Sequence, residues 1–123
     1  KREFKLKQKQ AIFYIKAARG ADGQGEPTSD GFVVFKGSKA AGSTVPSMTS
    51  GFLTLRQKLI DQGVLMDREE YLEFQEDYIF SSPSTASTIV LGRNSNGLLD
   101  WKMNDGKPLK DFESNDKSKF DDK

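Results

Sequence analysis

The chain of 123 residues contains no cysteine and no histidine. The missing cysteine excludes disulfides, thiol nucleophiles and thiolate-bound zinc. The missing histidine removes the usual general base near neutral pH and the commonest metal ligand. Catalytic arrangements of Ser-His-Asp or Cys-His are therefore impossible within this chain. We predict no catalytic residues, no cofactor and no metal, and a protein that binds a partner without transforming it.

Long apolar runs are also missing. No stretch approaches the roughly 20 apolar residues that span a bilayer, and no signal-peptide pattern is present. Hydrophobic residues make up 35% of the chain and charged residues 30%, which is typical of a globular domain rather than a disordered one. We therefore expect a cytoplasmic protein.

Net charge is small, at +1, and unevenly distributed. Residues 1–10 carry five Lys or Arg and one Glu, a local +4, whereas residues 111–123 carry five acids and three Lys, a local −2. The residues between them therefore carry −1 and lack the strongly basic face of a tight DNA binder. If the chain binds DNA, we expect weak binding that depends on tethering.

Composition divides the chain into three parts. Residues 1–10 are a basic segment, interpreted as a linker or a first strand, and residues 11–112 form a single α+β domain. Residues 113–123 are polar and predicted to be disordered.

Two segments rich in β-branched and aromatic residues predict strands, at residues 11–19 and 31–36. Residues 20–30 between them contain three glycines and a proline, which predicts a flexible loop that closes a hairpin of the two strands. Residues 37–47, rich in Gly, Ala, Ser and Thr, are predicted to be a second loop.

Apolar residues spaced i, i+3, i+7 predict a helix at residues 49–62. A second helix is predicted to begin with Ser82 as its N-cap and Pro83 in its first turn, and to end at Gly92. Residues 64–66 are predicted to be a short strand.

The remaining segments are less regular, and residues 67–77 receive no assignment. Apolar and charged residues alternate at 99–103, which predicts a strand, followed by a tight turn at 104–106 and a returning strand at 109–112. Strands cluster rather than alternate with helices. The predicted fold class is therefore α+β, a small antiparallel β-sheet with two short helices packed against it.

Two polar segments are candidate phosphate contacts. Lys36, Ser38 and Lys39 leave the end of a strand together, where backbone N–H groups and lysine can hold a phosphate. The alternative is a simple structural turn. Ser82 and Ser84 lie at a predicted helix N-terminus, which attracts anions, although capping alone explains Ser82.

Trp101 and an acidic segment each allow two interpretations. Trp101 is either a core residue or an exposed platform on which a base stacks. The acidic residues form either a solvated face or a carboxylate site for metal or hydrolysis. They are Asp67, Glu69, Glu70, Glu73, Glu76 and Asp77.

Several segments, taken in order, resemble one bacterial family, the domain of unknown function 4357. The resemblance covers about residues 12–112 and rests on residues 30–38, Leu55-Arg56, Leu59-Ile60, residues 80–86, Gly92-Arg93, Asn96-Gly97 and Trp101-Lys102. The Ser-Pro-Ser-x-Ala and Asn-Gly…Trp signatures are also similar to the RAMA (restriction enzyme adenine methylase associated) domain. The chain departs from the pattern at Leu98, where an aromatic residue is expected, and at Ser87, where Ala is expected.

The resemblance implies a domain that occurs with GIY-YIG nucleases and restriction–modification proteins, and RAMA is regarded as a DNA-reading module. Our first hypothesis is a non-catalytic accessory domain that recognises DNA, including modified DNA, beside a covalently linked or associated nuclease or methylase. The predicted contact residues are Lys36, Ser38, Lys39, Ser82, Ser84, Arg93, Asn96 and Lys102, with Trp101 supporting the pocket. The alternatives are a protein–protein docking module without affinity for nucleic acid and, third, hydrolysis by the acidic segment.

Overall fold

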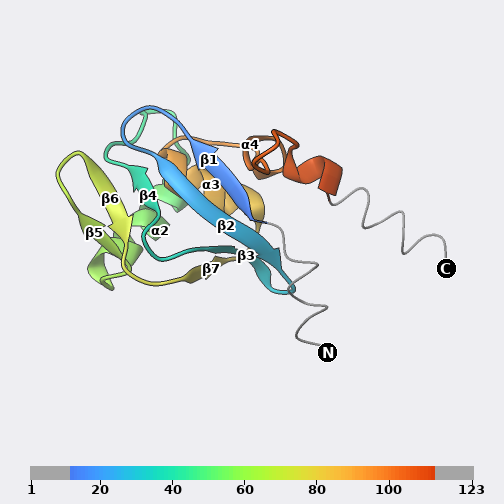
Figure 1. Cartoon of the computed structure of the whole chain (residues 1–123). Helices are drawn as coiled ribbons and strands as arrows, with labels where there is room; N and C mark the ends of the chain where they lie inside the picture. The colour runs from blue at the N-terminus through green and yellow to red at the C-terminus, as the bar shows by residue number, and fades with distance from the viewer. Residues whose placement is uncertain (1–11, 113–123) are drawn as a thin grey trace.

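The computed structural model describes residues 12–112 (Figure 1). The basic segment 1–10 and the polar tail 113–123, with the linker, strand and disorder predicted for them, lie outside the described residues. No helix within residues 12–112 combines the length and the apolar character needed to cross a membrane.

Seven strands form one antiparallel sheet in the described part of the chain. They are β1 (Phe13–Lys16), β2 (Asp22–Thr28), β3 (Gly31–Val34), β4 (Lys39–Ala41), β5 (Leu65–Asp67), β6 (Tyr71–Phe74) and β7 (Tyr78–Phe80). The spatial order is β5-β6-β4-β2-β3-β7, with β1 paired to β2. Gly25 of β2 pairs with both Phe13 and Val34, so β1 and β3 lie on opposite sides of β2.

The prediction that residues 20–30 form a flexible loop is wrong, because they contain β2. The segments predicted as a hairpin do not pair with each other, since both pair with β2. The glycines of β2 allow close approach rather than flexibility: a Cβ at Gly25 would lie 2.2 Å from the carbonyl oxygen of Val33. A Cβ at Gly23 would lie 3.5 Å from the Trp101 ring.

Three further segments of the sheet were not predicted, among them β7. The loop predicted at residues 37–47 contains β4, and the unassigned residues 67–77 contribute to the β5–β6 hairpin. The short strand predicted at 64–66 is confirmed as β5, one residue later.

Both predicted helices are confirmed, as α2 (Ser50–Asp61) and α3 (Pro83–Leu91). Gly63 follows α2 with φ +82°, and Gly92 ends α3 in the left-handed conformation, with φ +72°. Glycine adopts this conformation without the steric penalty of a Cβ, so both helix ends were visible in the sequence.

The strand predicted at residues 99–103 is wrong, because α4 (Gly97–Asp100) occupies its first half. Lys102 alone makes strand-like bridges, to Tyr14 and Pro108. The tight turn is present, with the N–H of Met103 donating to the Lys107 carbonyl at 2.8 Å. Residues 109–112 then form a helical turn instead of a returning strand.

The core lies between the sheet and α3, which passes behind β1 and β2 in Figure 1. Side chains alternate along the strands, so Phe13 and Ile15 are buried in the core while Tyr14 points to the other face. The Trp101 and Phe32 rings are stacked with centroids 4.5 Å apart. The α+β fold class, with an antiparallel sheet and short helices packed against it, is confirmed.

Candidate functional site

Ser82 caps the N-terminus of α3, as predicted. Its Oγ accepts a hydrogen bond from the backbone N–H of Thr85 at 3.1 Å and lies 3.0 Å from the Thr85 hydroxyl. Pro83 occupies the first turn, where its missing N–H leaves no helical hydrogen bond unmade. The hydroxyl of Ser82 therefore already has a structural task.

The first turn of α3 is joined to α4 by two hydrogen bonds and one close packing contact. The N–H of Gly97 donates to Ser84 Oγ at 2.9 Å, and the indole N–H of Trp101 donates to the Pro83 carbonyl at 3.1 Å. A Cβ at Gly97 would lie 2.3 Å from the carbonyl carbon and oxygen of Pro83. We call Pro83, Ser84, Gly97 and Trp101 the α3–α4 lock. The two sequence signatures that suggested DNA recognition thus meet in one packed structural contact.

Trp101 is a core residue, with 0% of its surface exposed. Its ring packs on Phe32 and over Gly23 of β2, and its only polar atom is paired with Pro83. The alternative of an exposed stacking platform is therefore excluded. Trp101 supports the segment that carries the candidate contacts rather than a ligand directly.

A ladder of hydroxyl groups continues the contact between α3 and the segment that follows it. Ser95 Oγ lies 2.8 Å from Ser87 Oγ and 2.5 Å from Oδ2 of Asp100, and Ser87 donates to the Ser84 carbonyl. Thr88 Oγ1 accepts from the N–H of Ser95 at 3.1 Å. Sequence reasoning missed this ladder, although the unexpected Ser87 in place of Ala was its signal.

Asn96 lies at the exposed end of this segment and caps α4. Its side-chain oxygen accepts from the N–H of Leu98 at 3.0 Å. The cap accounts for an Asn at this position, and a contact of its amide with DNA remains a prediction.

Ser38 is not able to reach a ligand, which corrects its place among the predicted contacts. It is 1% exposed, and its hydroxyl both accepts from the Gln24 N–H at 3.0 Å and donates to the Gln24 carbonyl at 3.2 Å. Gln24 lies on β2 opposite the gap between β3 and β4. The Ser38 hydroxyl bonds its backbone there, in place of a neighbouring strand. The structural-turn interpretation therefore holds for Ser38.

The two lysines beside Ser38 are exposed. The backbone N–H of Lys36 donates to Oδ1 of Asp77 at 2.7 Å, and the side chain of Lys36 is exposed to solvent. Lys39 Nζ lies 4.8 Å from the centroid of the Tyr71 ring, a cation–π contact on the face of the sheet away from α3.

Arg93 and Lys102 are exposed at the two ends of the segment that the α3–α4 lock holds. Arg93 directly follows Gly92, and Lys102 Nζ donates to the Leu99 carbonyl at 2.8 Å. Lys102 bridges to β1, whereas Lys39 lies on β4 across β2. The four predicted cations therefore surround the sheet and do not line one pocket.

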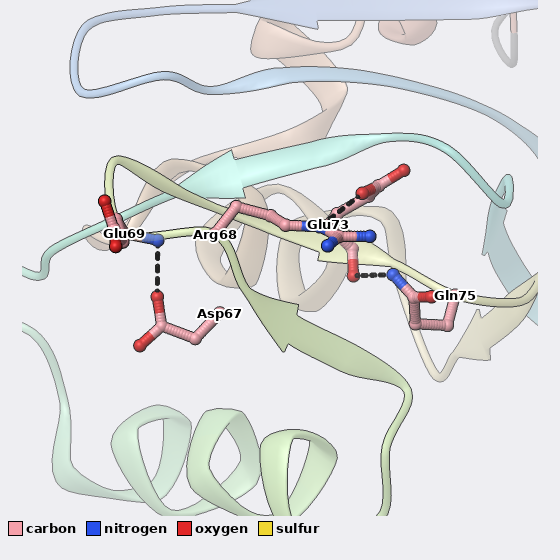
Figure 2. Close-up of polar contacts among 5 residues, drawn as sticks. All are labelled: Asp67, Arg68, Glu69, Glu73 and Gln75. Atoms are coloured by element: carbon pink, nitrogen blue, oxygen red, sulfur yellow. Dashed lines mark hydrogen bonds and ion pairs between the residues drawn. The ribbon is translucent and has the colours of Figure 1, made fainter.

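The acidic segment lies mostly on the exposed β5–β6 hairpin and the turn after it (Figure 2). Asp67 accepts from the N–H of Glu69 at 2.7 Å, and Arg68 Nε pairs with Glu73 at 2.9 Å. No group of His, Asp or Glu suited to a metal occurs in residues 12–112. These contacts support the interpretation as a solvated face that stabilises a turn.

Two arginines that were not among the predicted contact residues, Arg19 and Arg56, lie near the C-terminal end of α3. Arg19 donates to the carbonyls of Ser43, at 2.7 Å, and Leu91, at 3.1 Å. Arg56 of α2 is 7% exposed and donates from Nη2 to the Ala41 carbonyl, while its Nε–H is buried without an acceptor. Burial lowers the pKa of Arg56 to about 10, and the charge of Arg19 adds to the effect.

Fold and site together define a small α+β domain whose two signature segments are joined by a buried lock, with cations exposed around it. The profile of the family described as Domain of unknown function (DUF4357) matches residues 13–113, so the chain belongs to this family. No curated protein and no solved structure gives a significant match to the chain.

Proposed function

We propose that the chain is a non-catalytic accessory domain that contacts the DNA backbone through exposed cations. One observation carries the proposal: Lys36, Lys39, Arg93 and Lys102 are all exposed, and no side-chain nitrogen of the four lies within 4.0 Å of a carboxylate among residues 12–112. Unpaired surface cations neutralise phosphates without first breaking an ion pair. The family resemblance adds the expectation that a nuclease or methylase is linked to or associated with the domain.

The α3–α4 lock serves this proposal as a scaffold. Its hydrogen bonds fix residues 92–102 against α3, and this segment carries Arg93 at one end and Lys102 at the other. Pre-positioned cations lose less conformational freedom on binding. The lock residues then hold the segment in place without contacting DNA themselves, so a variant that loses one lock hydrogen bond and still folds should keep its affinity.

The spread of the cations determines the kind of binding we expect. They surround the sheet and do not converge on a pocket, and the chain carries a net charge of only +1. Such an arrangement favours weak contact with phosphates over base-specific readout. A tethered catalytic domain would supply the high local concentration that makes weak contacts effective.

A titration of the ¹⁵N-labelled chain with duplex DNA, at low and at moderate salt, tests the proposal. We expect the amide signals of Lys36, Lys39, Arg93 and Lys102 to shift at low salt and the shifts to shrink as salt rises. A matched duplex with methylated adenine shows whether modification alters the affinity. Unchanged signals at all four residues in both duplexes at low salt would disprove the proposal.

A second candidate, a protein–protein docking module, rests on the sheet face opposite α3. Tyr14 of β1 is 41% exposed there, and Ile79 of the edge strand β7 is 51% exposed. Glu26 lies on the same face, and partial burial raises the pKa of its carboxyl. Size-exclusion chromatography with the associated nuclease or methylase separates the candidates. Docking predicts a complex that Ile79→Lys disrupts, and no change in the amide signals when DNA is added.

A further inference from the structure

We propose that Arg19 and Arg56 form a binding site for one phosphate group at the C-terminal end of α3. Both guanidinium groups reach the end of β4 and the residues just after it, since Arg56 binds the carbonyl of Ala41, the last residue of β4, and Arg19 binds the Ser43 carbonyl. Arg19 also binds the Leu91 carbonyl at 3.1 Å. The site therefore brings together the turn between β1 and β2, helix α2 and the end of helix α3.

The pair has more hydrogen-bond donors than the described chain uses. Each guanidinium carries five N–H donors. Arg19 uses its two terminal nitrogens, on Ser43 and Leu91, and Arg56 uses one. The Nε–H of Arg56 is buried and has no acceptor, which is unfavourable for a charged donor. A tetrahedral oxyanion presents several acceptors to two such groups at once.

The charge of the pair is likewise uncompensated. The ion pair found among residues 12–112 is Arg68 with Glu73, so neither Arg19 nor Arg56 has a carboxylate within 4.0 Å there. The backbone of Glu70 lies close, since a Cβ at Gly42 would meet its carbonyl oxygen at 2.4 Å, but the Glu70 side chain is exposed. Carbonyl dipoles offset part of two full positive charges. Burial, with the charge of Arg19 as a smaller cause, lowers the pKa of Arg56, and a bound phosphate would offset the remaining positive charge.

Solvent reaches the site along an exposed loop. Gly42 and Ser43 are exposed, and Ser43 packs directly on the end of α3, where a Cβ at Gly92 would lie 2.4 Å from its carbonyl oxygen. The same Cβ would lie 3.4 Å from Nη1 of Arg19. Exposed Arg93, one of the predicted DNA contacts, directly follows Gly92 but is not part of the phosphate site. The phosphate site stands without Arg93 and does not depend on the proposed function.

The test is a titration of the ¹⁵N-labelled chain with inorganic phosphate, against sodium chloride at the same ionic strength. The Nε–H signals of Arg19 and Arg56 should shift with saturation in phosphate and not in chloride. Arg19→Gln should weaken phosphate affinity about tenfold or more, since it removes a charge-assisted donor pair. Arg68→Gln removes the same charge from an exposed ion pair and should leave the affinity nearly unchanged.

Equal shifts in phosphate and chloride, or equal losses in the two variants, would overturn the site. If Arg19→Gln does not fold, Arg19→Lys keeps the charge but loses the forked donors, and unchanged affinity in it would also overturn the site.

A duplex oligonucleotide that moves the same two Nε–H signals identifies a nucleic-acid phosphate as the source. Phosphate binding without any effect of the duplex identifies a small phosphate compound. Duplex binding at the lysines, with both Nε–H signals unmoved by phosphate, rejects the site and leaves the proposed function standing.

Discussion

The two ends of α3 use polar groups in opposite ways. At the N-terminal end, Ser82, Ser84, Gly97 and Trp101 find their partners in each other, in the helix backbone or in Pro83. At the C-terminal end, two arginines share three carbonyls and keep donors without acceptors. Fully paired polar groups hold a structure together, whereas unpaired charged donors keep the capacity to bind. The N-terminal end of α3, which carries the Ser-Pro-Ser-x-Ala signature, is therefore the scaffold. The C-terminal end, where the two arginines lie, has donors that can bind a ligand.

The largest expected effect comes from crowding the α3–α4 lock. Gly97→Ala places a methyl group 2.3 Å from the Pro83 carbonyl and should lower the free energy of unfolding by about 3 kcal/mol, because backbone must move. Denaturant unfolding measures it. Gly51→Ala is the matched control: nothing lies within 4 Å of its added Cβ, and this helical site should gain up to about 1 kcal/mol. Equal stability of the two variants would contradict the lock.

The second effect tests the indole of Trp101. Trp101→Phe leaves the Pro83 carbonyl without its donor and opens space beside Phe32, which should cost about 2 kcal/mol. The thermal midpoint measures it. Tyr14→Phe removes one polar atom at an exposed position and should change stability by less than about 0.5 kcal/mol. If Trp101→Phe leaves the stability unchanged, the buried hydrogen bond contributes nothing to it.

The third effect isolates one hydroxyl. Ser84→Ala leaves the Gly97 N–H unpaired and should cost about 1 kcal/mol, whereas Ser81→Ala, at an exposed position, should be within about 0.5 kcal/mol of the wild type. Chemical denaturation compares both. If Ser84→Ala keeps full stability but loses DNA affinity, Ser84 is a contact residue and the division between the two ends fails.

The smallest effect is expected at the other end. Arg56→Met exchanges a poorly paired buried cation for an apolar side chain of similar length, so stability at neutral pH should stay within about 1 kcal/mol or rise. Because burial lowers the pKa of Arg56 to about 10 in the folded state, the charged form is penalised there. That penalty is complete below pH 10 and fades as pH rises above it. Any advantage of Arg56→Met should therefore shrink in alkaline denaturation curves, and a growing advantage would contradict the assigned burial cost.

Local signals in the sequence were sufficient for α2 and α3, but not for α4, which was predicted as a strand. Ser82, Pro83 and Gly92 are caps and stops that act within one turn, and α3 begins and ends where they predict. The strand β2 was not predicted because its glycines are required by distant residues. The Val33 carbonyl lies against Gly25, and Trp101 packs over Gly23. A glycine that permits packing looks the same in sequence as a glycine that permits flexibility.

The site was predictable only in part, for the same reason. The cap role of Ser82 is local, but the bond from Gly97 to Ser84 exists only because the chain folds back along α3. Arg56 looked like an ordinary polar position on a helix. Its side chain bonds to β4 and lies near the charge of Arg19, both distant from Arg56 in the sequence, and no spacing in the sequence reveals these contacts.

The salt dependence of DNA affinity tests the central claim most directly. The wild type, the double variant Lys36→Gln/Lys39→Gln and Ser84→Ala are compared on one duplex at increasing salt. We predict that log K falls with log salt, that each lysine removed reduces the slope by about one, and that folded Ser84→Ala keeps the wild-type slope and affinity. Affinity that ignores salt, or that is lost in Ser84→Ala and kept in the lysine variant, would contradict the account.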